Sequence, residues 1–169
     1  METWETSGMS RLTMDTTMYD VYERNINIRL LPIDSKTVLL TASLLDLNHS
    51  ITTEVTIDLA TQEIRDADVK MMRAPYEQCS KAREPIHKII GLKIERGVNK
   101  KIADAIGHTY GCIHVVEILQ NAMRFAASML IGVRAGYGTF EKRRELSEEE
   151  RLEKVMPYLK NTCVVFKDK

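Results

Sequence analysis

The sequence lacks an excess of charge of either sign, because 24 lysine and arginine residues balance 24 aspartate and glutamate residues. A neutral chain gives no electrostatic reason to expect binding to nucleic acid or to an anionic membrane surface. There are only three cysteines, an odd number that is a poor basis for a disulfide framework. Free thiols fit a reducing compartment, so we expect a cytoplasmic protein.

Long hydrophobic runs are also missing. Residues 1–5 have neither the basic start nor the apolar stretch of a signal peptide. The apolar segment 115–133 is interrupted by Glu117, Gln120, Asn121 and Arg124, so it does not predict a membrane span. The sequence contains no phosphate-binding glycine loop and no convincing Ser-His-Asp arrangement. These absences leave a chain of 169 residues, 44% hydrophobic, which is enough for the core of one domain.

The periodicity of the sequence changes from that of strands to that of helices. Residues 1–18 are polar and aperiodic, and we expect them to form a flexible N-terminal arm before a single domain over 19–169. Alternating or extended apolar patterns predict four strands, separated by short turns, over 23–30, 37–47, 52–59 and 64–71. Four successive strands with short connections are typical of an antiparallel meander.

After the strands, helical spacing predicts helices over 80–90, 98–106, 112–131 and 147–160. Ser147 and Glu150 have the spacing of a capping box, which marks the start of the last helix. Residues 164–166 have the composition of a short edge strand. We therefore expect an α+β fold, an antiparallel β-meander followed by helices packed on one face. The sequence leaves open whether the long helix pairs with its copy in a homodimer.

Cys112 and His114 form the most informative pair in the chain. They follow a glycine and precede the long helix, so Cys112 is expected at a helix N-terminus, where the backbone dipole favours a thiolate. A thiolate and a neutral imidazole are good ligands for a soft or borderline divalent metal. Two ligands do not complete a site, so other ligands must come from elsewhere in the chain.

Cys79 and His49 are the candidates for the remaining ligands. Cys79 also lies at a predicted helix start, and His49 interrupts an apolar strand near a tight connection. Cys79 and Cys112 can equally be small half-buried residues, because no compact C-x-x-C spacing is present. A histidine in a loop is more often an ordinary surface residue, so His49 is a good candidate ligand only if its loop faces the two helix starts.

Other reactive side chains are weaker candidates. Cys163 follows the last helix and remains a fifth ligand or a reserve thiol. Glu117 lies one turn beyond His114 and is the nearest candidate base for a metal-dependent reaction. His87 and His108 are expected to be structural or exposed to solvent.

Several short motifs together resemble a bacterial family that is defined only as a domain of unknown function. The motifs are a histidine ahead of V-x-I-D, an A-P-Y-x-x-C loop, an L/I-x-G-hydrophobic segment, G-C-x-H and a late T-C, here His49 with 55–58, 74–79, 89–92, 111–114 and 162–163. The resemblance covers roughly residues 19–166. Members often have aspartate after the histidine, whereas this chain has Ser50, so any role of that aspartate is absent here.

The chain is also similar, more weakly, to the NifU-type iron–sulfur cluster scaffolds. In those proteins an antiparallel sheet is followed by helices. Their ligands lie in a connection between strands, at the start of the first helix and at the start of a late, long helix. The resemblance implies a scaffold-like role for His49, Cys79, Cys112 and His114, with His49 replacing a cysteine of the scaffold. Two histidines and two cysteines suit zinc or a mononuclear iron better than a labile cluster, unless Cys163 joins them.

The sequence thus predicts a metal-binding protein of unknown cellular role, with zinc or iron held by His49, Cys79, Cys112 and His114. Three hypotheses remain. The metal has a structural role and joins the helix starts to the sheet, or the protein carries iron–sulfur clusters or sulfur, or it is a metal-dependent enzyme. The substrate and any protein partner are left unnamed.

Overall fold

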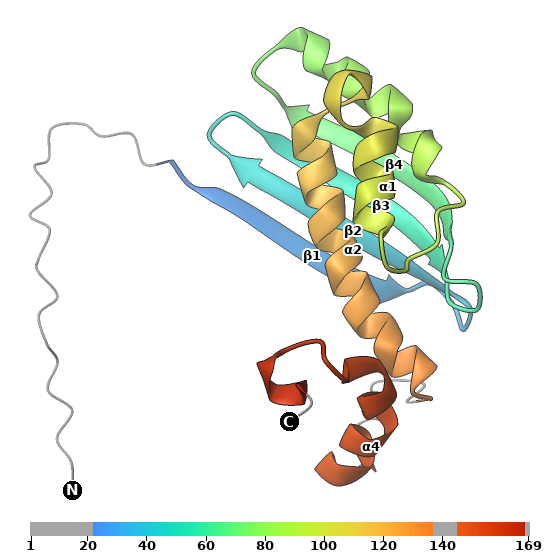
Figure 1. The fold of residues 1–169 in the computed structure, drawn as a ribbon. Coiled ribbons are helices and arrows are strands. Elements are labelled where there is room, and N and C mark those ends of the chain that lie inside the picture. Colours follow the sequence, from blue (N-terminus) through green and yellow to red (C-terminus); the bar gives the residue numbers. More distant parts are fainter. Residues whose placement is uncertain (1–21, 137–144, 168–169) are drawn as a thin grey trace, which may run out of the picture.

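Four strands form one antiparallel sheet in the order in which they occur in the chain (Figure 1). The computed structural model describes residues 22–136 and 145–167. The strands are β1 (Arg24–Pro32), β2 (Thr37–Asp46), β3 (Ser50–Asp58) and β4 (Ile64–Arg73). This is the predicted meander, and every strand boundary lies within two residues of its predicted position.

One face of the sheet is buried because apolar residues alternate along the central strands. In β2 the buried positions are every second residue, and β3 follows the same rule. The register sets Leu40 opposite Val55 and Ala42 opposite Thr53, so the buried positions of the two strands share a face. That face carries the core of the protein.

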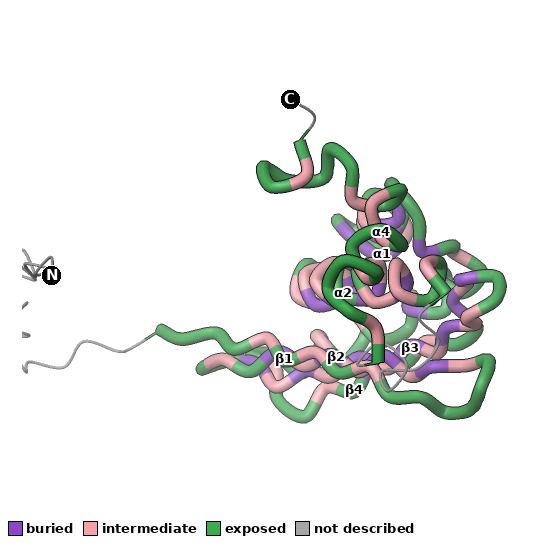
Figure 2. Tube along the Cα trace, turned by 90° about the horizontal axis from the view of Figure 1, so that it is seen from below, coloured by how far each residue is buried: buried purple, intermediate pink, exposed green. Residues whose placement is uncertain are grey.

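Helices follow the strands along the chain, and those that precede residue 135 lie on the buried face of the sheet. They are η1 (Glu77–Ile89), α1 (Val98–Ile106), η2 (His108–Tyr110), α2 (Ile113–Arg134), α4 (Glu148–Leu159) and η3 (Val164–Phe166), where η denotes a 3₁₀ helix. Figure 2 shows buried residues on the sheet and on the helices where the two layers meet. The α+β class and the packing of helices on one face are therefore confirmed.

Helix α2 is the central element of the helical layer. Its buried residues recur at helical spacing and face the sheet: Val115, Val116, Ile118, Leu119, Ala122, Met123, Ala126 and Leu130. At the other end of the chain the predicted capping box is present, since the Ser147 side chain accepts from the Glu150 amide and the Glu150 carboxylate accepts from the Ser147 amide.

Two predicted elements differ from the structure. The first helix is a 3₁₀ helix that begins at Glu77, so Cys79 lies in its first turn and not ahead of it. Pro85 lies inside this helix and has no N–H to donate, which disfavours a regular α-helix there. The expected edge strand Val164–Phe166 is a single 3₁₀ turn, in which the Phe166 amide donates to the Cys163 carbonyl.

Residues 1–18, the predicted arm, lie outside the described residues. Within residues 22–136 and 145–167, none of the helices combines the length and the apolar character needed to cross a bilayer.

Candidate metal centre

A tight loop places Cys112 at the start of α2. Gly107 ends α1, and Gly111 follows the short η2 helix. A Cβ atom on Gly111 would collide with the Ile106 carbonyl oxygen, and one on Gly107 with the Ala103 carbonyl oxygen. Only glycine permits this close return of the backbone. Cys112 is the N-cap of α2, at the helix N-terminus, as the sequence predicted.

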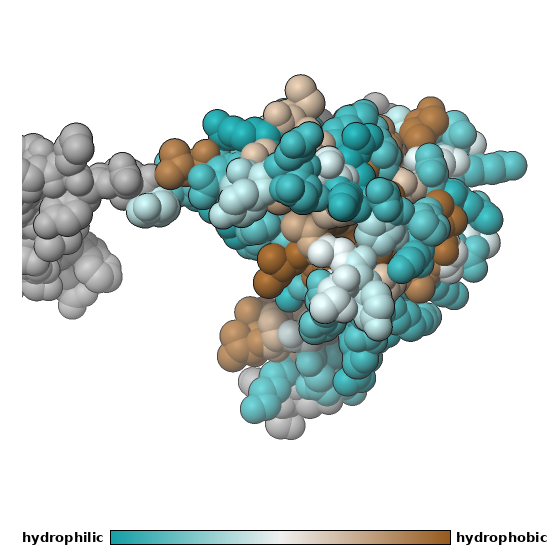
Figure 3. All heavy atoms as spheres, turned by 90° about the horizontal axis from the view of Figure 1, so that it is seen from above, coloured by the Kyte–Doolittle hydropathy of each residue, from teal (hydrophilic) through white to brown (hydrophobic). Residues whose placement is uncertain are grey.

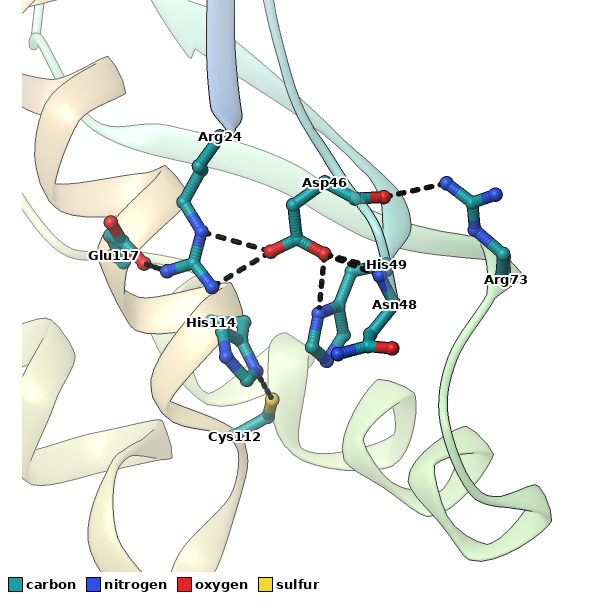
Figure 4. A network of polar contacts seen from close by, with 8 residues as sticks. All are labelled: Arg24, Asp46, Asn48, His49, Arg73, Cys112, His114 and Glu117. Carbon is teal, nitrogen blue, oxygen red and sulfur yellow. Dashed lines mark hydrogen bonds and ion pairs between the residues drawn. The ribbon is translucent and has the colours of Figure 1, made fainter. Parts of the chain in front are cut away.

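His49 lies in the connection between β2 and β3, and only 9% of it is exposed. The loop is shaped by Asp46, whose Oδ1 accepts from the backbone N–H groups of Asn48 (2.9 Å) and His49 (2.7 Å). The same oxygen lies 2.9 Å from His49 Nδ1. The carboxylate of Asp46 therefore fixes both the turn and the imidazole (Figure 4).

Arginine side chains surround Asp46 from two directions (Figure 4). Arg24 Nε donates to Asp46 Oδ2 at 2.9 Å, and its Nη1 donates to Glu117 Oε2 at 2.7 Å. Arg73 Nη2 donates to the Asp46 backbone carbonyl at 2.6 Å. Arg24 thus joins strand β1, the β2–β3 turn and helix α2 behind the histidines.

These contacts decide the protonation of the site. Burial alone would raise the pKa of the Asp46 carboxyl, but the hydrogen bonds from His49, Arg24 and the two backbone amides outweigh it and hold that pKa well below its usual range. Asp46 is ionised at neutral pH and can only accept. In the neutral imidazole with its proton on Nδ1, the Nδ1–H of His49 donates to it and Nε2 carries the ring lone pair.

His114 packs against His49 from the first turn of α2. The two ring centroids are 4.0 Å apart with the planes at 41°, and His114 Nδ1 lies 3.7 Å from Cys112 Sγ. Burial, and then the nearby His49 and Arg24, lower the pKa of His114 below its ordinary value of 6.5. A lowered pKa keeps this imidazole neutral, the form in which histidine binds metals.

Cys79, in η1, lines a cavity at the start of α2, and His49 is not among the residues that line it. Cys79, Cys112 and His114 all line one cavity of about 970 Å³, which lies between η1, the loop after α1 and the start of α2. All three cysteines of the chain are free thiols. Within the described residues, the Cys79 thiol makes no hydrogen bond to the other candidate ligands.

His49, His114 and Cys112 are neighbours without being a preformed metal cage, whereas Cys79 shares with Cys112 and His114 only the lining of the cavity. In the part of the chain that the structure describes, no group of three or more His, Cys, Asp or Glu side chains is already arranged to hold an ion. Ring nitrogens and thiol sulfurs of this kind match the preferences of zinc and iron.

Cys163 does not join this group. It is exposed and directly precedes η3, after α4, and Figure 1 shows α4 beside the C-terminal end of α2, whereas Cys112 is the N-cap of that helix. A second cavity, of about 1130 Å³, lies near Cys163 between α2, α4 and the end of the sheet. It is lined by no cysteine and no histidine.

Sequence reasoning did not identify Asp46 and Arg24 as part of the site. A signal for Asp46 is present, because an aspartate that opens a short connection is typical of a turn in which its carboxylate accepts backbone N–H groups. Arg24 lacks such a signal, since its partner Glu117 is 93 positions away. Glu117, the predicted base, is ion-paired with Arg24 at 2.7 Å.

Comparison with known proteins identifies one family. The family model described as a protein of unknown function (DUF2889) matches residues 10–128, a range that includes every candidate ligand except Cys163. Searches of curated proteins and of solved structures found no match. The similarity to NifU-type scaffolds therefore stays a prediction.

Proposed function

The chain belongs to the DUF2889 family, and we propose that it is a metal-binding protein. The proposed ion is zinc or iron. Its proposed ligands are the four that the sequence singled out, His49, Cys79, Cys112 and His114.

One observation carries this proposal: the line of contacts from Asp46 through His49 to His114 and Cys112. Histidine ligands of metals usually donate their second ring nitrogen to a carboxylate, which fixes the tautomer and directs the other nitrogen to the ion. Asp46 gives His49 that arrangement, at 2.9 Å. The neutral ring of His114 and the Cys112 sulfur lie directly beside it.

The cavity favours a metal ion that small molecules can reach over a purely structural ion that is closed off from solvent. Cys79, Cys112 and His114 line about 970 Å³ of open space, and a catalytic zinc or iron needs an open coordination position. A metal-dependent enzyme is therefore the second candidate function. Because Glu117 is held by Arg24, a base for such a reaction has to come from another group.

Elemental analysis of protein purified without oxygen tests the proposal. We expect the wild-type chain to retain zinc or iron, and His49→Ala and Cys112→Ser to lose most of it, because each removes a ligand. His87→Ala and Cys163→Ser are matched controls. His87 is exposed and its Nδ1 contacts the Glu84 carbonyl, and Cys163 is exposed far from the cavity, so both variants should keep the metal.

The proposal is wrong if the wild-type protein is metal-free after growth with added zinc and iron, or if His49→Ala and His87→Ala retain equal amounts. Visible absorbance separates the remaining alternative. A colourless, zinc-loaded protein contradicts the iron–sulfur scaffold role, whereas colour that disappears in Cys112→Ser supports it.

A further inference from the structure

The mouth of the cavity carries large side chains that are unusually exposed. Tyr76 is 72% exposed, Tyr110 64% and Ile113 74%, and all three line the cavity. Seen from the end of the molecule at which α2 begins, the surface is mostly hydrophilic, with small, separate hydrophobic patches (Figure 3). Patches of this size suit a small ligand, since a stable protein interface needs a much larger continuous area.

The described residues that line the cavity include a lysine and no carboxylate. Lys81 is that lysine, and no aspartate or glutamate of the described part of the chain is among the lining residues. Lys88 lies beside the rim, its Nζ 5.7 Å from the centre of the Tyr110 ring. Among the ion pairs of the described residues, none includes Lys81 or Lys88. These ammonium groups are available to an anion from solution.

The start of α2 adds to this positive character. Its N-cap, Cys112, gives the helix no side-chain cap, and the first turn contains no acidic residue. The free amides of a 22-residue helix carry a partial positive charge, which in this structure lies at the cavity wall. The helix end, the lysines and the absence of carboxylates all favour the same ligand charge.

We propose that this cavity binds a small aromatic carboxylate. The flat ring of the ligand packs against Tyr76 and Tyr110, and its carboxylate is bound by Lys81 and the first amides of α2. Tyrosine offers an apolar face for stacking, and a lysine–carboxylate bond supplies affinity and orientation. The role of this molecule as a substrate rests on the proposed function, whereas its binding does not, so the two ideas can fail separately.

Isothermal titration of the purified protein, whose metal content is measured first, with benzoate tests the inference. Benzamide keeps the ring without the charge, and acetate keeps the charge without the ring. We expect saturable binding of benzoate, and binding at least tenfold weaker for both analogues. Lys81→Gln should weaken benzoate binding roughly tenfold or more, because it removes a charge-assisted bond, and Lys81→Arg should restore most of it. Lys93→Gln, an exposed lysine that does not line the cavity, is the control.

Two results overturn the inference: benzoate fails to bind, or Lys81→Gln binds benzoate as the wild-type protein does. Equal affinity for benzoate and benzamide also contradicts it, because charge would then play no part. Metal content, measured on the same samples, separates the two ideas. If the protein contains metal but does not bind benzoate, this inference alone is contradicted. If the protein is metal-free but binds benzoate, the proposed function alone is contradicted.

Discussion

Asp46→Asn is expected to lower the free energy of unfolding by roughly 1–3 kcal/mol, because a nearly buried carboxylate loses its charge-assisted bonds to Arg24 and His49. For a chain of this size, that corresponds to a fall in Tm of about 3–10 °C. Urea unfolding at neutral pH measures it. The loss combines three connections, since Asp46 holds the β2–β3 turn, the imidazole and, through Arg24, helix α2.

The same variant should change the acid side of the stability curve. The pKa of Asp46 is lower in the folded protein than in the unfolded chain, so the unfolded state binds more protons as the pH falls. The stabilisation is complete above the unfolded pKa of about 4 and is lost as the pH falls further. Asparagine does not titrate, so Asp46→Asn should show a shallower loss of stability in acid than the wild-type protein.

Asp58→Asn is the matched control. Asp58 ends β3, accepts from the backbone N–H groups of Ala60 and Thr61, and pairs with the exposed Arg65. The Thr61 amide and Arg65 are the main reasons why the pKa of Asp58 falls to about 2. It resembles Asp46 in accepting from two backbone amides and pairing with an arginine, but its side chain is more exposed (23% against 11%), has no histidine contact and has no ion-paired link to α2. Equal losses of stability in the two variants at neutral pH would contradict the role assigned to Asp46.

Ile118→Ala should destabilise the protein by roughly 2–5 kcal/mol, because it leaves a cavity between α2 and the sheet. Ile118 is fully buried in α2. Ile113, five residues earlier in the same helix, is 74% exposed, so Ile113→Ala removes the same atoms without opening the core. The difference between their urea midpoints measures burial directly, provided that both unfold with similar denaturant dependence.

Similar midpoints for Ile118→Ala and Ile113→Ala would show that α2 is not packed as described. A large loss in Ile113→Ala alone would imply that the cavity mouth is covered in solution.

The sheet was predictable because its information is local. Alternation over 52–59 placed Val55 and Ile57 on the buried face of β3 correctly, and short turns between strands left the meander as the simplest topology. Helix α2 and the capping box at Ser147 were predictable for the same reason, since each signal lies within a few turns of chain.

The site was only partly predictable because its connections are distant in sequence. The pairing of Cys112 with His114 follows from their spacing, and the structure adds His49 from a different layer of the fold. No local pattern indicates that Arg24 reaches both Asp46 and Glu117. The turn at Val164–Phe166 was predicted wrongly as a strand, because β-branched residues predict strand only where a partner strand is available.

The position of Arg24 has a consequence for how far the domain extends. Strand β1 is one of the two edge strands of the sheet, and its loss would leave three paired strands behind. Arg24 is the first residue of that strand, and its guanidinium is the counter-charge for two carboxylates on other elements. A chain trimmed to begin after residue 24 would therefore keep most of its hydrophobic core while Asp46 and Glu117 faced each other without the cation between them.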